Sequence, residues 1–199
     1  MKRNKLFRSS SPINDRAGRN LAADHCIQSY DIGHIINLYD TKEQAEAMEG
    51  YSDTYASRTD TAYIRMGLDY TSKRFGKNVA DVMNYIAQNK GRYVIHCILG
   101  EHRTGAVCMI LSALMGASYD ELADDYMLTC RNLYGVQKGT KQYNLLLDDN
   151  VNAVLLNLFG VHDPKSADLR HLAEEFVLST GITEQTLSRV REQLSSQEQ

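Results

Sequence analysis

The sequence predicts an α/β fold with a small central, mostly parallel sheet flanked by helices, and a C-terminal half made of helices. Three observations support this prediction. Strand patterns and helix patterns alternate over the first half of the chain. After residue 103 only helix patterns follow, so the second half is expected to pack as helices on the sheet. No repeat, linker or shift in composition divides the chain, and we expect one domain over residues 1–199.

Short apolar runs between turn-forming residues are typical of buried strands. Three such runs occur in the first half, at residues 34–39 (HIINLY), 62–66 and 93–96 (YVIH). The run at 62–66 is the weakest of these patterns. Residues 8–12 are interpreted as a loop or the end of a strand, and the polar stretch 50–60 as a loop.

Helix start signals and helical periodicity predict the helices. Asn14 is a suitable cap for a first helix that ends near Gln28. Thr41 to Gln44 and Ser118 to Glu121 are capping boxes, each of which opens a further helix. The remaining helix patterns cover residues 72–89, 104–115, 140–159, 166–180 and 183–194. Residues 104–115 are apolar on nearly every side, which predicts a helix buried at the centre of the domain.

Composition excludes several classes of protein. Hydrophobic residues make up 43% of the chain and charged residues 24%, values that exclude intrinsic disorder. The net charge of −3 offers no basic surface for nucleic acid or an anionic membrane. No apolar run is long enough to span a membrane, and the N-terminal segment lacks the apolar core of a secretory signal. We therefore expect a cytoplasmic protein that binds no nucleic acid.

The four cysteines show neither a CxxC pair nor the spacing of metal ligands. They are Cys26, Cys97, Cys108 and Cys130. Reduced thiols are expected, and no metal or other cofactor is implied. Cys26, Cys108 and Cys130 are interpreted as small buried hydrophobic residues. Cys97 is different because of the residues around it.

Residues 94–105 read Val-Ile-His-Cys-Ile-Leu-Gly-Glu-His-Arg-Thr-Gly and join the strand pattern at 93–96 to the central helix pattern. In a loop of this length, between a strand and a helix, the backbone N–H groups point inward, and the helix N-terminus adds positive partial charge. Together they form an anion cradle of the size of a phosphate. The planar guanidinium of Arg103 can bind two phosphate oxygens. Gly100 can adopt a left-handed conformation in the middle of the loop.

Cys97 is expected at the base of this cradle, where the local field favours its thiolate. A thiolate below a bound phosphoryl group is placed for in-line attack, which gives a phosphocysteine intermediate. The hydroxyl of Thr104 can hydrogen-bond the sulfur and ease its departure in the second step. The motif therefore predicts a cysteine-dependent phosphatase.

The pattern H-C-x5-R-[ST]-G resembles the loop of the protein tyrosine phosphatase superfamily. The segments LFRSSSP (6–12), HIINLYD (34–40) and MGASYDELADDYMLT (115–129) are similar to the compact bacterial group of these enzymes, so the resemblance covers most of the chain. It implies that Cys97 is the nucleophile, that Arg103 binds the phosphoryl group, and that His96 lies behind the loop and orients it. The implied phosphate-binding loop consists of Ile98, Leu99, Gly100, Glu101, His102 and Arg103.

One departure from the family pattern affects the expected chemistry. Such loops often carry Lys-Asp before the arginine, whereas this chain carries Glu101-His102. Glu101 is expected to place negative charge at the mouth of the site and to weaken binding of highly phosphorylated substrates. His102 can replace the aspartate as general acid. Asp69, upstream of the cysteine as in other family members, is an equal alternative, and Asp60 is a weaker third choice.

The expected activity is hydrolysis of phosphate monoesters, with phosphotyrosine in proteins or a small phosphoester as substrate. Alternatives are an inositol phosphate or phosphoinositide phosphatase, an inactive phosphate-binding module and, last, a rhodanese-like sulfurtransferase. The resemblance implies that Arg8 lines the site, but it is interpreted first as a surface residue, and Asp124 and Asp125 are assigned no role. None of the twelve tyrosines is distinguished by its sequence context.

Overall fold

A four-stranded, all-parallel sheet lies at the centre of the protein, in the strand order β1-β4-β2-β3. The computed structural model describes residue 1 and residues 3–195. The strands are β1 (Leu6–Ser9), β2 (His34–Asn37), β3 (Asp60–Tyr63) and β4 (Tyr93–His96). Ile95 of β4 is paired with Arg8 of β1 on one side and with Ile36 of β2 on the other. The predicted α/β fold with a parallel sheet is confirmed.

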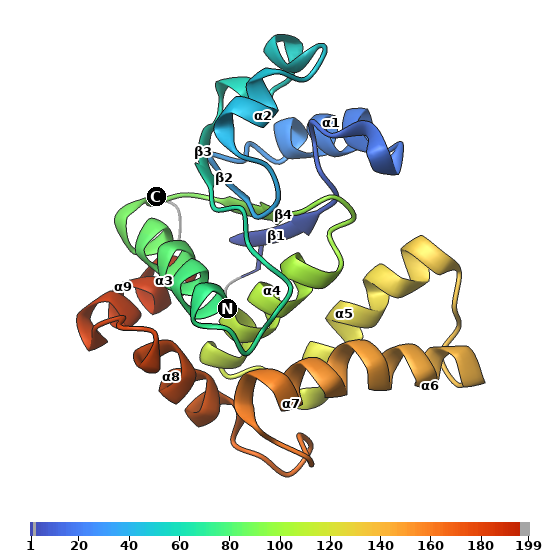
Figure 1. Ribbon diagram of the computed structural model, residues 1–199, viewed down its shortest axis with the longest axis vertical. Coiled ribbons are helices and arrows are strands. Elements are labelled where there is room, and N and C mark those ends of the chain that lie inside the picture. Colours follow the sequence, from blue (N-terminus) through green and yellow to red (C-terminus); the bar gives the residue numbers. More distant parts are fainter. Residues whose placement is uncertain (2, 196–199) are drawn as a thin grey trace.

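Helices cover both faces of this sheet (Figure 1). The helices are α1 (Asn20–Ser29), α2 (Lys42–Glu46), α3 (Lys73–Gln88), α4 (His102–Leu114), α5 (Tyr119–Tyr134), α6 (Lys141–Leu147), α7 (Ala153–Phe159), α8 (Leu169–Ser179) and α9 (Glu184–Ser195). Helices α1 and α2 pack on one face, where Ile35 and Val94 belong to a small core. The other helices pack on the opposite face, where Ile36 and Ile95 belong to a much larger core. Alternate residues of a strand point to opposite faces, so β2 and β4 each contribute to both cores.

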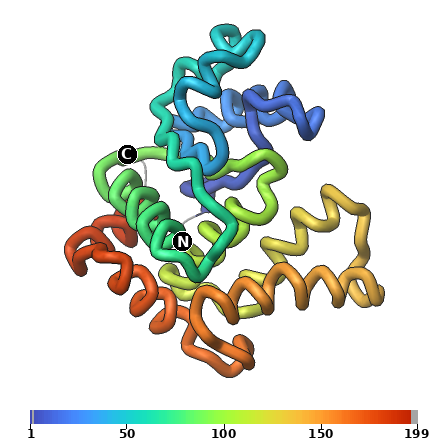
Figure 2. The backbone as a smooth tube through the Cα atoms, in the orientation of Figure 1, coloured from blue at the N-terminus to red at the C-terminus, as the bar shows by residue number. Residues whose placement is uncertain are grey.

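Helix α4 is the central helix of the larger core, as predicted. It contacts β4 and β1 of the sheet and packs against α5 and α8 on its other sides. Ten of its residues are buried, which accounts for their almost uniformly apolar character. Figure 2 shows the chain continuing from α4 through the C-terminal helices, coloured yellow to red, on this side of the sheet. Within residues 1 and 3–195, no helix is long and apolar enough to cross a bilayer.

Both predicted capping boxes are present, at Thr41 with Gln44 and at Ser118 with Glu121. The predicted start of the first helix is wrong. Asn14 caps a short 3-10 turn at residues 15–17 instead, and its side chain accepts a hydrogen bond from the Arg16 N–H. The turn ends at a glycine with positive φ, and α1 begins only at residue 20.

Strand boundaries also differ from the sequence patterns. β2 ends at Asn37, because its side-chain oxygen accepts the N–H groups of Tyr39 and Asp40 and turns the chain. β3 begins at residue 60, two residues before the predicted apolar run. β1 is a full strand where only a loop or strand end was expected, because it pairs with β4. The stretch 50–60 contains two 3-10 turns, and a π-helical turn at 148–152 interrupts the predicted helix 140–159.

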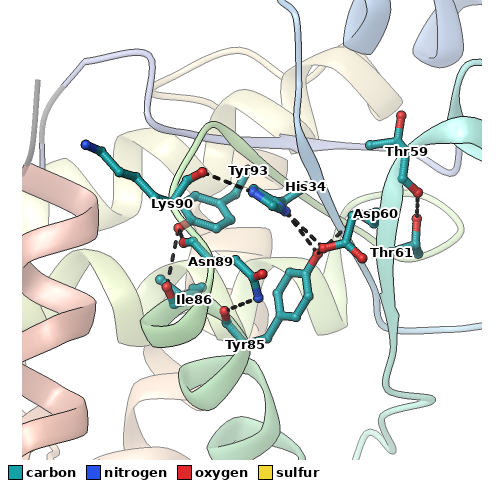
Figure 3. A network of polar contacts seen from close by, with 9 residues as sticks. All are labelled: His34, Thr59, Asp60, Thr61, Tyr85, Ile86, Asn89, Lys90 and Tyr93. Atoms are coloured by element: carbon teal, nitrogen blue, oxygen red, sulfur yellow. Dashed lines mark hydrogen bonds and ion pairs between the residues drawn. The ribbon is translucent and has the colours of Figure 1, made fainter. Parts of the chain in front are cut away.

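Polar side chains join the amino ends of three strands, at the edge of the sheet opposite the carboxyl end of β4 (Figure 3). Nδ1 of His34 lies 3.1 Å from a carboxylate oxygen of Asp60, and its Nε2 lies 3.2 Å from the carbonyl oxygen of Lys90. The hydroxyl of Tyr85 donates to the same Asp60 oxygen at 2.7 Å. This network ties α3 to the amino ends of the strands. The segment that carries Cys97 leaves the opposite, carboxyl end of β4.

Candidate active site

Residues 97–103 leave the carboxyl end of β4 and lead directly into α4, as the sequence predicts. Backbone hydrogen bonds hold this loop on both sides. The N–H of Ser11 donates to the carbonyl oxygen of Ile98 at 2.9 Å, and the N–H of Gly105 donates to that of Glu101 at 2.6 Å. The first bond comes from the segment after β1, the strand beside β4 in the sheet. The loop is therefore fixed by its neighbour strand as well as by the helix that it opens.

Gly100 has φ = +73°, the left-handed conformation predicted for it. A Cβ atom at this position would lie 2.3 Å from the carbonyl oxygen of Ser9. Conformation and space therefore both require glycine here.

Arg8 holds the loop from the β1 side, so its interpretation as a surface residue is wrong. Its Nη2 donates to the carbonyl oxygen of Gly100 at 2.9 Å, and its Nη1 lies 2.6 Å from Oδ2 of Asp125 on α5. The guanidinium also lies over the ring of Tyr126, 5.4 Å from its centroid. Asp125, to which no role was assigned, orients Arg8.

Cys97 is 4% exposed and lies at the base of the loop. His96, the last residue of β4, is fully buried, and its Nδ1 lies 3.1 Å from the carbonyl oxygen of Cys97. Because a carbonyl oxygen only accepts, this Nδ1 carries the proton and donates. Burial lowers the pKa of His96 to about 4, against a smaller opposing effect of this hydrogen bond. His96 is therefore a neutral donor to the backbone of the loop.

The guanidinium of Arg103 is held by a carbonyl oxygen and an aromatic ring. Its Nε donates to the carbonyl oxygen of Met66 at 2.7 Å, and its carbon lies 5.2 Å from the ring centroid of Tyr39. The Tyr39 hydroxyl in turn accepts a hydrogen bond from Arg16 at 2.9 Å. Arg103 borders a cleft of about 410 Å³, which is also lined by Tyr39, Gln44, Arg65, Met66, Gly67 and Arg74. The Nε bond leaves the two Nη groups for a ligand.

Tyr39 and Tyr70 border the site, although the sequence did not distinguish them from the other tyrosines. Burial raises the pKa of Tyr70 to about 12, Arg103 opposes this effect, and Cys97 and Glu101 add to it. The phenol of Tyr70 is therefore within electrostatic range of all three loop residues. Tyr39 follows β2, the strand beside β4, but this adjacency depends on a strand order that local patterns do not encode.

The expectation that Glu101 places negative charge at the mouth is wrong. Its side chain is buried and accepts a hydrogen bond from the Tyr134 hydroxyl at 2.6 Å. Sγ of Cys130 lies 4.0 Å from its other carboxylate oxygen. Glu101 therefore points toward α5, and its charge is held inside the protein.

The candidate general acids lie in different settings. His102 is the first residue of α4, and its side chain is 50% exposed. Asp69 is exposed, and its Oδ1 accepts hydrogen bonds from the N–H and hydroxyl of Thr71, at 3.2 and 2.8 Å. Neither side chain lines the cleft beside Arg103. Asp60 lies at the opposite edge of the sheet, paired with His34, so the third choice is wrong.

The two residues after Arg103 are closely packed. Thr104 is fully buried, and its Oγ1 has no hydrogen-bond partner within the described residues. A Cβ atom on Gly105 would lie 2.1 Å from the ring of Tyr126, so this glycine lets α5 approach α4. In the Thr-Gly pair of the motif, Thr104 provides a hydroxyl without a hydrogen-bond partner within the described residues, and Gly105 allows close packing of two helices.

All four cysteines lie in the described part of the chain and are free thiols. Cys108 and Cys130 are buried, as predicted, and burial raises the pKa of Cys108 to about 12. Cys26 is exposed on α1, so its interpretation as a buried residue is wrong. Over residues 1 and 3–195, no three His, Cys, Asp or Glu side chains are grouped as metal ligands.

Comparison with known proteins identifies the family of the chain. A model of the tyrosine phosphatase family matches residues 1–196, which include the loop, the sheet and the C-terminal helices. No curated protein matches the chain significantly. Because the family match extends over nearly the whole length, it covers every element that positions residues 97–103. The chain therefore belongs to the tyrosine phosphatase family and is a phosphatase.

Proposed function

We propose that the protein hydrolyses phosphate monoesters through a phosphocysteine intermediate, with Cys97 as nucleophile, as one cytoplasmic phosphatase domain over residues 1–199. The observation that carries this proposal is the fixed position of Arg103. Its Nε is bound to the carbonyl oxygen of Met66, and its guanidinium borders the 410 Å³ cleft. An arginine oriented in this way can bind two oxygens of a phosphoryl group beside the cysteine loop.

Binding of the phosphoryl group uses charges that are already in place. The Nη groups of Arg103, the N–H groups of loop residues 98–102 and the N-terminus of α4 all favour a dianion. The bonds from Arg8 and Ser11 hold the loop before substrate arrives. Catalysis gains from this arrangement, because donors that are already oriented need not reorganise in the transition state.

In the first step the Cys97 thiolate attacks phosphorus in line. The sulfur–phosphorus bond forms, the bond to the leaving oxygen breaks, and that oxygen takes a proton from the general acid. We assign the general acid to His102, with Asp69 as the alternative. His102 adjoins Arg103 and half of its side chain is exposed, whereas Asp69 already accepts two hydrogen bonds from Thr71.

In the second step water attacks the phosphocysteine, the sulfur–phosphorus bond breaks, and the general acid of the first step takes the proton of the water. The departing sulfur then carries the negative charge. The Thr104 hydroxyl, buried and without a partner within the described residues, can donate to that sulfur. His96 supports both steps by holding the Cys97 carbonyl oxygen.

Phosphotyrosine in proteins is the substrate that we propose first. Tyr39 lines the cleft, its hydroxyl accepts a hydrogen bond from Arg16, and its ring packs against the guanidinium of Arg103. These contacts fix the orientation of the ring in the cleft. Tyr70 provides a second aromatic side chain near the loop. Aromatic rings pack well against the ring of a phenyl phosphate ester.

Hydrolysis of para-nitrophenyl phosphate, in the presence of a chelator, tests the mechanism. Wild type is expected to turn over, and Cys97→Ser is expected to lose activity by several orders of magnitude. Cys26→Ser, at an exposed cysteine on α1, is the matched control and should behave as wild type. Strict dependence on a metal, or full activity of Cys97→Ser, would contradict the proposal. A folded wild type without turnover between pH 5 and 8 would favour the phosphate-binding module instead.

A further inference from the structure

We infer that Arg65 and Arg74 form a second anion subsite, which selects substrates carrying another carboxylate or phosphate close to the reacting phosphoryl group. This inference rests on the proposed phosphatase function and assigns specificity residues to the same cleft. Both arginines line the 410 Å³ cleft together with Arg103. No carboxylate is among the residues that line it. One cleft therefore holds three arginines in a protein whose net charge is −3.

A direct backbone connection links Arg65 to the catalytic arginine. Met66, the next residue, accepts the Nε hydrogen bond of Arg103 through its carbonyl oxygen. The segment is also fixed to the exit of β2, because the N–H of Met66 donates to the carbonyl oxygen of Leu38 at 2.9 Å. Ile64 makes the equivalent bond to Asn37 at 2.9 Å. The position of Arg65 is therefore set by the same contacts that orient Arg103.

The backbone of Arg65 is held in an unfavourable conformation. Its φ is +47°, in the left-handed region that side chains other than glycine, asparagine and aspartate seldom adopt. A glycine would relieve this cost, and the chain uses glycine at most of its other left-handed positions. Strained residues fixed by surrounding contacts are concentrated at functional sites. A cation kept at this position, at the edge of a phosphate site, has a direct use there.

The position of Arg74 is electrostatically unfavourable within its own helix. It is the second residue of α3, and the first turn of this helix contains no acidic residue. A cation near a helix N-terminus is destabilising, because the helix dipole is positive there. Within the described residues neither Arg65 nor Arg74 has an ion pair or a side-chain hydrogen bond, and both are exposed. An anionic group on the substrate would satisfy both arginines and the helix end.

The size of the cleft limits the distance between the two anionic groups. Of loop residues 97–103 only Arg103 lines the cleft, so the reacting phosphoryl group would lie at its Arg103 end. The remaining volume, out of about 410 Å³, suits an aromatic ring with one further anionic substituent, or a residue with an acidic side chain beside a phosphotyrosine. Because Glu101 is buried against α5, its carboxylate does not project into the cleft where the second anion would bind. The structure thus removes the reason for expecting weak binding of doubly anionic substrates.

The test compares substrates that differ only in the second charge. 3-Carboxyphenyl phosphate and 3-carbamoylphenyl phosphate have similar shapes, and only the first carries the extra anion. Wild type should prefer the carboxylate by about three- to tenfold in kcat/KM at low salt, the effect of two exposed ion pairs. The preference should decrease as ionic strength increases. The double variant Arg65→Gln/Arg74→Gln should show a ratio near one, and Arg65→Lys/Arg74→Lys should keep most of the preference.

Controls separate this inference from the proposed function. Arg189→Gln, an exposed arginine on α9 outside the cleft, should leave the ratio as in wild type. A wild-type ratio near one, or an unchanged ratio in the Gln double variant, would overturn the subsite. If wild type turned over neither compound, the same pair would be compared by calorimetric binding to Cys97→Ser. That comparison tests the subsite even when the proposed chemistry has failed.

Two further substrate pairs identify the source of the second anion. One pair consists of phosphotyrosine peptides with Glu or Gln beside the phosphotyrosine. The other pair consists of 1,3-phenylene bisphosphate and phenyl phosphate. A preference for the Glu peptide that disappears in the Gln double variant supports an acidic protein segment. A preference for the bisphosphate over phenyl phosphate that disappears in the Gln double variant, without a preference for the Glu peptide, supports a small polyphosphorylated substrate. No preference in either pair overturns the inference.

Discussion

Nη2 of Arg8 donates a hydrogen bond of 2.9 Å to the carbonyl oxygen of Gly100, in the middle of the loop formed by residues 97–103. Arg8 belongs to β1, an edge strand that contributes no residue to the Cys-x5-Arg motif. The same guanidinium is paired with Asp125 of α5 at 2.6 Å. One side chain therefore joins an edge strand, the loop and a helix, and holds the carbonyl oxygen of Gly100 in place.

Replacement of Arg8 should affect both stability and activity. Arg8→Ala removes a charge-assisted bond to Gly100 and should lower the free energy of unfolding by about 2 kcal/mol. It should also lower kcat/KM about tenfold, because the loop loses a fixed point. Urea denaturation and hydrolysis of para-nitrophenyl phosphate measure the two effects. Asp125→Asn keeps the Arg8–Gly100 bond and should cost less in both assays. Equal losses in the two variants would show that the Arg8–Gly100 bond is unimportant.

Gly100→Ala should be among the most damaging single substitutions. It combines a positive φ with a Cβ atom 2.3 Å from the Ser9 carbonyl oxygen, so the loop must shift. We expect loss of activity and a decrease in the free energy of unfolding of more than about 2 kcal/mol. Gly116→Ala is the matched control, because its φ is +83° but the space around it is open. It should cost only about 1–2 kcal/mol and keep the activity. Similar effects of the two substitutions would contradict the steric argument.

Burial of neutral His96 should make stability depend on pH. Its pKa is lowered from 6.5 to about 4 in the folded protein, so between these values only the unfolded chain takes up a proton. Stability is therefore complete above pH 6.5 and is lost as pH decreases, by about 2 kcal/mol at pH 5. His96→Asn can still donate to Cys97 but does not titrate in this range. Unfolding free energies at pH 7 and pH 5 should show the smaller decrease in the variant, and parallel decreases would exclude His96 as the cause.

The identity of the general acid can be determined from the rates of two variants. His102→Gln is expected to lower kcat for phenyl phosphate by about 10²- to 10³-fold. Asp69→Asn should change kcat only severalfold, because it disturbs the turn with Thr71 but removes no proton donor from the reaction. A good leaving group, as in para-nitrophenyl phosphate, should reduce the His102 effect. The opposite ranking of the two variants would assign the role to Asp69.

Local patterns were sufficient for most helices and strands. The capping boxes at Thr41 and Ser118 act within four residues, and the strand at 93–96 was predicted with its observed bounds. The start of the first helix was wrong because Asn14 caps a 3-10 turn, an outcome that the same cap residue also permits. β1 was not assigned as a strand, because its stability depends on pairing with β4, about ninety residues away in the sequence.

The chemistry proposed for the loop could be predicted from local patterns, because Cys97, Gly100, Arg103 and Thr104 lie within one short segment between a recognisable strand and helix. The surroundings of that loop depend on tertiary packing. The strand order brings β1 and the segments that follow β2 and β3 close to the loop. Asp60 is the first residue of β3 and therefore lies at the opposite end of the strands, paired with His34. Helix packing turned Glu101 inward and left Arg65 and Arg74 in the cleft. These outcomes depend on contacts between segments far apart in the chain, which a local pattern of residues does not encode.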